Sequence, residues 1–332
     1  MIFGDCRDTM RDLKARGVRV QCCVTSPPYY GLRDYGHPGQ IGLEKTPAEY
    51  VAAMVEVFAL VRELLADDGV LWLNLGDSYA NDGKWGGSSG GKHVTALHGN
   101  TGVGRGKKET GLKPKDLIGI PWRVAFALQE AGWYLRQDVI WHKPNPMPES
   151  VADRCTKAHE YLFLLSKSER YYWDAEAMKE EATGQLPGNV NPPKGQKAYE
   201  AGDDRHRTKA GLAAYSFKRR TATTLPPGAP HQHREDREDV SYLGTRNRRS
   251  VWTVPTVPYS GAHFATFPPA LIEPCILAGS RAGDVVLDPF FGSGTTGQVA
   301  QHLGRQWIGC ELNQDYEPLQ KERTAQCGLA FA

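Results

Sequence analysis

Apolar residues along the chain form short continuous runs, which alternate with longer segments bounded by helix signals. The run 20–25, VQCCVT, predicts a buried strand, and the run 70–77, VLWLNLGD, predicts a second one. Between them, the segment 46–69 predicts a helix, because both of its ends carry boundary signals. These signals are the capping residue Thr46, the first-turn Pro47, the capping-box Glu49 and the terminating Gly69.

The same alternation returns along the rest of the chain. The predicted elements are a helix over 121–132, strands over 133–143 and 160–168, a helix over 269–278, and strands over 284–290 and 305–312. Repeated strand–helix–strand units are typical of α/β domains with a parallel sheet. The pattern therefore predicts a doubly wound, mostly parallel α/β sheet.

Two segments lack this pattern. Residues 81–115 are rich in glycine and predict a mobile loop, and residues 181–250 are rich in Pro, Gly, Arg and His. We therefore expect one domain in two halves, 1–180 and 251–332, separated by an inserted module at 181–250.

Charge distinguishes these segments from the rest of the chain. The whole chain has a formal net charge of +2. Residues 81–115 hold seven Lys/Arg against two Asp/Glu, and residues 191–250 hold thirteen against seven. Two basic segments on an acidic body favour a polyanionic partner, although solvated basic loops would show the same composition.

Cysteine usage and apolar content limit the class of protein. The seven cysteines show no repeated C-x-x-C spacing, which argues against a disulfide framework and against a zinc site. His231 and His233 have no matching cysteines, so we expect no metal. The start of the chain is not typical of a signal peptide, and no apolar run is long enough to span a membrane. We expect a soluble cytoplasmic protein.

The segment 285–297, VVLDPFFGSGTTG, predicts a strand, a glycine turn and a helix start, which together can bind a nucleotide. The spacing departs from the strict dinucleotide fingerprint, because Pro289 and two phenylalanines crowd its front. Glu311 ends the next predicted strand, where an acid can bind ribose hydroxyls. The alternative is an ordinary glycine turn with an unrelated surface acid.

The segment 24–36, VTSPPYYGLRDYG, ends a predicted strand with two prolines and two tyrosines. Proline cannot extend a strand ladder or a helix, so this loop is rigid by construction. Together, the two segments resemble the β-class DNA amino-methyltransferases, in which the target-base half precedes the cofactor half. The resemblance covers almost the whole chain except much of 181–250. It implies a Rossmann-like methyltransferase sheet, S-adenosyl-L-methionine as cofactor and target recognition by the 181–250 module.

Five motifs carry this resemblance: IFGDC (2–6), TSPPYY (25–30), HFATFP (263–268), DPFFGSGTT (288–296) and IGCELN (308–313). They imply the catalytic residues Ser26, Pro27, Pro28 and Tyr29. They imply the cofactor residues Asp5, His263, Phe267, Asp288, Phe290, Gly292, Gly294, Thr295, Thr296 and Glu311. In this assignment Asp5 reaches the cofactor adenine, Glu311 binds its ribose, and 263–268 contacts its methionine part.

The chemistry explains why such a loop is useful. The exocyclic amine of a base is a poor nucleophile, because its lone pair is delocalised into the ring. Ser26 and a backbone carbonyl beside Pro27 can accept hydrogens from this amine, so that positioning and electrostatics suffice. Tyr29 can stack on a base that has left the duplex.

Double-stranded DNA is the partner that the resemblance implies, and it also allows a homodimer and a cognate restriction endonuclease. The predicted DNA contacts are Tyr30, Arg219, Arg220, Arg246, Arg248 and Arg249. For Tyr30, packing beneath the loop is an equal alternative.

The target base receives conflicting indications. Within the family, Ser at position 26 is commoner in enzymes that act on cytosine N4, whereas the whole string TSPPYYGLRDYG looks like solitary bacterial and phage enzymes, among which adenine methylation occurs. This slightly favours adenine N6, with cytosine N4 as the alternative. Two more distant alternatives are a nicotinamide-dependent oxidoreductase, which gives no use for Ser-Pro-Pro-Tyr, and a protein-glutamine methyltransferase, which usually has Asn at position 26.

Overall fold

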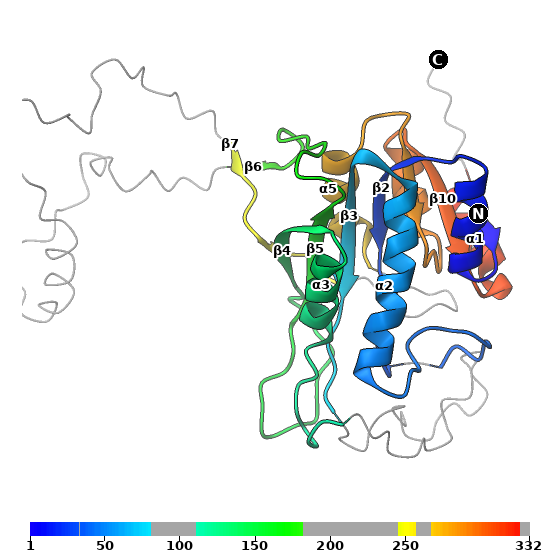
Figure 1. The fold of residues 1–332 in the computed structure, drawn as a ribbon. Coiled ribbons are helices and arrows are strands. Elements are labelled where there is room, and N and C mark those ends of the chain that lie inside the picture. Colours follow the sequence, from blue (N-terminus) through cyan, green and yellow to red (C-terminus); the bar gives the residue numbers. More distant parts are fainter. Residues whose placement is uncertain (33, 81–110, 182–244, 257–266, 326–332) are drawn as a thin grey trace, which may run out of the picture. The chain divides into compact units, whose positions relative to one another are not determined.

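The computed structural model describes residues 1–32, 34–80, 111–181, 245–256 and 267–325 (Figure 1). The chain divides into two compact units. The first joins Met1–Lys179 with Asn247–Ala332, and the second is Glu180–Arg246. Everything described below, apart from β6 and β7, belongs to the first unit.

The first unit is built on an eight-stranded sheet with the order β1-β10-β9-β2-β3-β5-β4-β8. The strands are β1 (Ile2–Phe3), β2 (Val20–Thr25), β3 (Leu65–Leu75), β4 (Tyr134–His142), β5 (His159–Ser166), β8 (Val251–Thr253), β9 (Val285–Asp288) and β10 (Gln306–Glu311). Neighbours from β1 to β3 are parallel, β5 is antiparallel to β3 and β4, and β4 is parallel to β8. The predicted mostly parallel α/β sheet is therefore confirmed.

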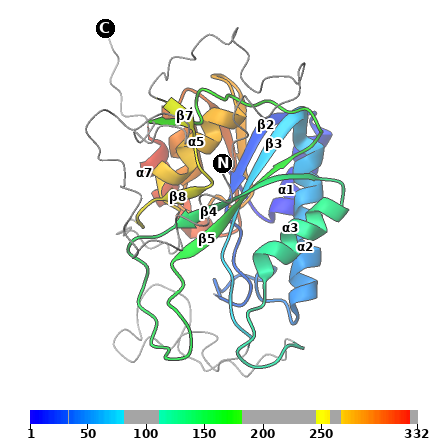
Figure 2. The ribbon, with the colours of Figure 1, turned by 90° about the vertical axis from the view of Figure 1, so that its left-hand side faces the viewer.

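Helices cover both faces of this sheet, as Figure 2 shows, with α1 to α3 on one side and α5 and α7 on the other. They are α1 (Cys6–Ala15), α2 (Pro47–Leu64), α3 (Ile120–Glu130), α5 (Pro269–Gly279), α6 (Thr295–His302) and α7 (Glu317–Thr324). A short 3-10 helix, Gln314–Tyr316, precedes α7. Each face of the sheet has its own apolar cluster, so the first unit has three layers.

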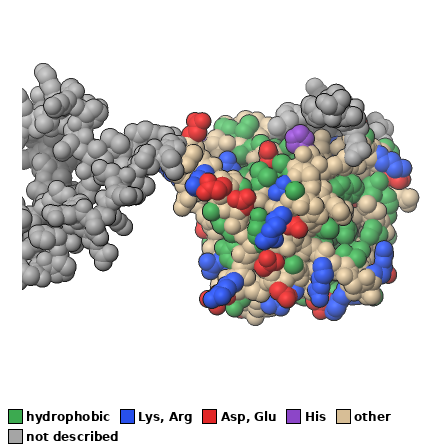
Figure 3. All heavy atoms as spheres, turned by 90° about the horizontal axis from the view of Figure 1, so that it is seen from above, with side chains coloured by type: hydrophobic (Ala, Val, Ile, Leu, Met, Phe, Trp, Pro, Cys, Tyr) green, Lys and Arg blue, Asp and Glu red, His purple; other side chains and the backbone are tan. Residues whose placement is uncertain are grey.

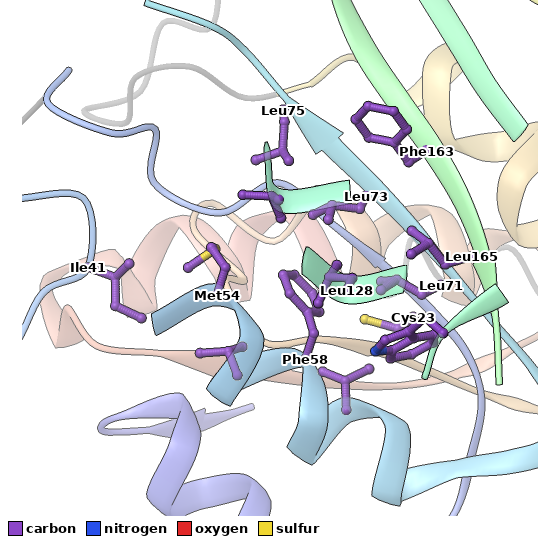
Figure 4. Close-up of a cluster of buried hydrophobic side chains, with 14 of the residues drawn as sticks. Cys23, Ile41, Met54, Phe58, Leu71, Leu73, Leu75, Leu128, Phe163 and Leu165 are labelled. Carbon is purple, nitrogen blue, oxygen red and sulfur yellow. The ribbon is translucent and has the colours of Figure 1, made fainter. Parts of the chain in front are cut away.

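Alternation along the strands sends neighbouring side chains into different clusters. Cys23 packs with Met54, Phe58 and Leu71 under α2, as Figure 4 shows. Cys22 faces the opposite cluster, with α5. Both thiols are fully buried, and each fills a core position like a small apolar side chain.

The capping signals at the start of α2 are confirmed. The Glu49 amide donates to Thr46 Oγ1, and the Thr46 amide donates to Glu49 Oε2, both at 3.2 Å. The end of the helix differs from the prediction: α2 stops at Leu64, and Leu65 is already extended and paired with Val20. Pairing with β2 outweighs the helix signals here, because it buries β3 on both faces.

A separate two-stranded sheet pairs β6 (Lys179–Glu181) with β7 (Thr245–Asn247). Among the described residues, no helix is long and apolar enough to cross a membrane. On the face seen in Figure 3, basic and acidic side chains are interspersed.

Candidate active site

A pocket in the first unit opens at the carboxyl ends of the parallel strands β1, β10, β9 and β2. Its wall contains Gly4 and Asp5 after β1, residues 26–29 after β2, residues 289–293 after β9, and residues 312–313 after β10. Open α/β sheets bind ligands at this edge. The structure thus brings β1 and β10, the first and last of these strands in the sequence, together, and the amide of Gly4 donates to Glu311 O at 2.9 Å.

The glycine turn between β9 and α6 depends on backbone conformations that side chains disfavour. Gly292 and Gly294 have φ values of 50° and 88°, and Gly294 caps α6. Between them and the sheet, the ring of Phe291 stacks on Trp307 with centroids 5.0 Å apart. A Cβ at Gly297 would lie 2.6 Å from this ring, so this last glycine of the motif serves packing.

Glu311 closes the turn from the end of β10. Its Oε2 accepts from the Gly292 amide at 2.7 Å, and its Oε1 accepts from the Asn313 amide at 2.8 Å. Burial raises the pKa of Glu311 to about 7. The carboxylate lines the pocket, in the position where sequence reasoning expects ribose hydroxyls to bind.

Asp288 joins the glycine turn to the centre of the sheet. It accepts from Thr25 Oγ1 and Thr296 Oγ1, both at 2.6 Å, and from the Phe290 amide at 3.0 Å. Burial raises the pKa of Asp288 to about 6. Although Asp288, Phe290 and Thr296 all line the pocket, these bonds show that Asp288 mainly holds the loop to β2.

Asp5 caps the first helix from the pocket wall. Its Oδ1 accepts from the Arg7 amide at 2.8 Å, and the Arg7 guanidinium lies beside both carboxylate oxygens. This arrangement lowers the pKa of Asp5. Two further expected cofactor residues, Phe267 and Thr295, also line the pocket.

The loop that contains the predicted catalytic residues 26–29, called the catalytic loop below, is anchored by side chains from α2, β3 and β5. The Tyr50 hydroxyl, on α2, donates to Pro28 O at 2.9 Å. Ser26 Oγ lies 3.2 Å from Asn74 Oδ1, on β3. The Tyr29 hydroxyl donates to Glu160 Oε2 at 2.7 Å, on β5. Ser26 and residues 27–29 all line the pocket.

Burial and the neighbouring Glu160 raise the pKa of the Tyr29 phenol well above its ordinary value. Tyr29 therefore stays protonated and donates. Lys143 forms an ion pair with Glu160, so its ammonium is engaged behind the loop.

The expectation that Tyr30 contacts DNA is wrong. Its side chain is 1 % exposed, and its ring packs 5.5 Å from that of Tyr50. Its hydroxyl donates to Lys45 O at 3.3 Å. Neighbouring side chains of the loop point in different directions, so Tyr29 lines the pocket and Tyr30 packs into the core.

The arginines expected to contact DNA fall into three groups. Arg246 forms an ion pair with Glu180 at 2.8 Å, and the Arg248 guanidinium lies 5.0 Å from the centre of the Trp252 ring. Arg249 is exposed. Arg219 and Arg220 lie outside the described residues, as does the expected cofactor residue His263.

Sequence reasoning missed several residues around the pocket. Tyr35, His37 and Gln40 contribute to its wall from the segment after the catalytic loop. Asn74 lies behind the wall and is 1 % exposed. It stands in the otherwise apolar run 70–75, and a buried polar residue in such a run is a signal that could have found it.

A family model described as DNA methylase matches residues 20–322. The chain belongs to this family of N6/N4 DNA methylases. It is 45 % identical over 323 residues to the Type II methyltransferase M.SmaI of Serratia marcescens, covering 97 % of this chain and 89 % of that protein. It is 44 % identical over 313 residues to the Type II methyltransferase M.Cfr9I of Citrobacter freundii, covering 94 % and 83 %.

Solved structures share the fold. The PvuII DNA methyltransferase, described as cytosine-N4-specific, has a TM-score of 0.56 at 18 % identity and covers 99 % of this chain and 86 % of its own. The complex of M1.HpyAVI with SAM has a TM-score of 0.50 at 17 % identity and covers 98 % of both chains.

The family depends on S-adenosylmethionine, and the pocket fits this cofactor. Its wall combines the Glu311 carboxylate, which sequence analysis expects to bind ribose hydroxyls, with aromatic side chains such as Phe267 and Phe290. Ser293 Oγ, in the glycine turn, is buried and has no hydrogen-bond partner among the described residues. A buried hydroxyl in a pocket wall is satisfied when a polar ligand binds.

Proposed function

We propose that this protein is a sequence-specific DNA methyltransferase that transfers a methyl group to the exocyclic amine of a flipped-out base. One observation carries the proposal: the Ser-Pro-Pro-Tyr loop and the glycine turn with Glu311 line the same pocket. A cofactor on Glu311 and a base on Ser26 would then be neighbours. Neither the basic segments nor the proline loop has a use in a nicotinamide-dependent oxidoreductase.

The residues of this protein contribute to the reaction by holding the base amine and the loop carbonyl in position. S-adenosylmethionine supplies an electrophilic methyl group on a sulfonium. Ser26 Oγ and a backbone carbonyl beside Pro27 accept hydrogens from the base amine and free its lone pair. Pro27 and Pro28 hold that carbonyl, and the Tyr50 bond to Pro28 O restrains the loop from below. Tyr29 lines the same wall and contacts the base.

For the base, we place cytosine N4 first and adenine N6 second. The slight preference for adenine depends on the likeness of the whole loop string to solitary enzymes. The relatives at 44–45 % identity are instead named Type II methyltransferases. Within the loop, Ser26 lines the pocket. Ser26, which is commoner in enzymes acting on cytosine N4, is therefore the better guide.

The Type II names of these relatives also favour a cognate endonuclease that reads the same DNA site. The basic module at 181–250 remains our candidate for reading that site, and Arg249, which is exposed, is its best-placed described residue. The phosphate charge of DNA provides affinity for such a module.

The experiment is to incubate the protein with S-adenosylmethionine and unmethylated mixed-sequence DNA, digest the DNA and analyse its nucleosides by mass spectrometry. N4-methylcytosine is the expected product. N6-methyladenine would support methyl transfer to a base amine but would make adenine, and not cytosine, the target base. If neither product forms while the cofactor binds, the proposal of DNA amine methylation is refuted, and a protein-glutamine substrate is the next to test.

A further inference from the structure

Behind the catalytic loop, outside the pocket wall, three polar side chains lie at the ends of neighbouring strands, on the same edge of the sheet as the pocket. They are Asn74 in β3, Glu160 in β5 and Lys143 directly after β4. Asn74 is 1 % exposed, and the side chains of Glu160 and Lys143 are 15 % and 18 % exposed. Burying such groups costs free energy unless every one of them is bonded, so this cluster points to a role that apolar residues could not fill.

The hydrogen bonds of Asn74 fix the orientation of its amide. Its Nδ2 donates to Tyr161 O at 3.1 Å and to Glu160 Oε2 at 3.3 Å. A carbonyl oxygen accepts only, and so does a carboxylate. The ammonium of Lys143 lies against Glu160 Oε1 and balances its negative charge. The amide nitrogen of Asn74 must therefore face β5, and its Oδ1 must face the catalytic loop.

This orientation decides what Ser26 can offer to a ligand. Asn74 Oδ1 accepts only, so Ser26 Oγ, at 3.2 Å, donates its one hydrogen to it. The lone pairs of Ser26 Oγ are then left for the pocket. With the reverse amide orientation, Ser26 would accept from Asn74, and its hydrogen would point into the pocket against the N–H of a base amine.

We propose that Glu160 is a positioning residue: acting through the Asn74 amide, it sets the Ser26 hydroxyl as an acceptor for the target amine. The Tyr29 hydroxyl lies 2.7 Å from the same Glu160 oxygen and 3.1 Å from Asn74 Oδ1, and its one hydrogen goes to the nearer, charged acceptor, so Ser26 and Tyr29 both depend on this carboxylate. The inference rests on the proposed function, because the acceptor is useful only if an amine enters the pocket.

The first test replaces Glu160 by an isostere. In Glu160→Gln the side-chain amide can donate as well as accept, so only Tyr161 O still requires a donor from Asn74, and the Tyr29 hydroxyl loses its charged acceptor. We expect kcat for methyl transfer to unmethylated DNA to fall by about 50-fold, because a misdirected catalytic group costs on the order of 100-fold. The Kd for S-adenosylmethionine and the KM for DNA should stay within about threefold. The control is Glu149→Gln, which removes another partly buried ion pair, that with Arg154, and should keep kcat.

The second test changes the residue between Glu160 and Ser26. Asn74→Leu removes the acceptor, whereas Asn74→Asp retains an oxygen facing Ser26. We expect kcat to fall more in the leucine variant than in the aspartate variant, by about tenfold, with cofactor affinity alike in both. Thermal melting would show whether Glu160→Gln folds. If it does not fold, this pair of variants still tests whether Asn74 positions the Ser26 hydroxyl.

The wild-type product is measured first. If the wild type forms no methylated amino base, the proposed function fails, whatever the variants do. If it forms the product while Glu160→Gln and Asn74→Leu keep kcat within about threefold, the positioning role alone is refuted. A parallel loss of kcat and cofactor affinity in all three variants would also refute it, because that result indicates general support of the fold.

Discussion

On the cofactor side of the pocket two carboxylates accept hydrogen bonds from neutral donors, whereas behind the catalytic loop a carboxylate is paired with a cation. Glu311 accepts from two backbone amides, and Asp288 accepts from two threonine hydroxyls and one amide. Behind the catalytic loop, Glu160 is paired with Lys143. Burial raises the pKa of both Asp288 and Glu311, and the hydrogen bonds from their neutral donors offset only part of this rise.

We infer that the glycine-turn side sets the affinity for the cofactor and that the catalytic-loop side sets the rate of methyl transfer. The backbone of a glycine turn, fixed by its packing, provides a rigid surface for a cofactor. A side-chain network can instead set the donor and acceptor roles of individual catalytic groups. Substitutions on the two sides should therefore change different measured quantities.

The largest effect is expected from Tyr29→Ala. This variant removes the ring that packs against Gly76 and the hydroxyl that donates to Glu160. We expect kcat to fall by about 100-fold, while the Kd for S-adenosylmethionine, measured by calorimetry, stays within about threefold. Tyr30→Phe, at the buried neighbour, removes one hydroxyl outside the pocket and is the control. If Tyr29→Ala lowers kcat and cofactor affinity by equal factors, the catalytic loop also supports cofactor binding, and the two sides do not have separate roles.

On the cofactor side, Glu311→Ala should produce the converse result. It removes the carboxylate that lines the pocket and leaves the Gly292 amide without its acceptor. We expect the cofactor Kd to rise by about 30-fold, since a hydrogen bond to a charged group contributes about 2 kcal/mol. With saturating cofactor, kcat should change far less. An unchanged Kd would remove Glu311 from the cofactor site.

Packing under the glycine turn can be tested with Gly309→Ala. A Cβ at Gly309 would overlap the Phe291 ring, which stacks on Trp307. We expect the free energy of unfolding to fall by about 2 kcal/mol, as overpacked cores lose 1–3 kcal/mol. Gly304→Ala is not a matched control, because Gly304 has a φ of 73° that alanine disfavours. Ala300→Gly, within the buried part of α6, gives a comparison without overlap. If Gly309→Ala melts at the same temperature as the wild type, the Phe291 ring can move aside, and the prediction of overpacking is wrong.

The last prediction concerns the pH dependence of stability. The pKa of Asp288 is raised to about 6 and that of Glu311 to about 7. In the unfolded chain these carboxyls lose their protons near pH 4, so the folded state binds more protons over roughly pH 4–7. The contribution of these groups to stability is therefore full at about pH 4 and is lost as the pH rises to about 7. Glu311→Gln should flatten the slope of unfolding free energy against pH in urea titrations, and an unchanged slope would contradict the raised pKa.

Much of the fold follows from local patterns. The strand at 20–25 and the capping box of α2 were predictable because an apolar run and a capping box depend on residues that are close in sequence. The end of α2 was not, because Leu65 leaves the helix to pair with Val20, and this pairing is long-range. The glycine turn and the proline loop were recognisable as motifs, but their separation along the chain conceals that they line one pocket.

The sequence by itself determined the alternating α/β architecture, the rigid loop after β2 and the acid at the end of β10, because each depends on residue types at short spacing. Only the tertiary structure decided that Tyr29 lines the pocket while Tyr30 packs into the core. It also decided that Ser26 meets Asn74 and that Asn74 meets Glu160, across 48 and 86 residues of sequence. These contacts arise when β2, β3 and β5 become neighbours in the sheet, and no local pattern encodes that order.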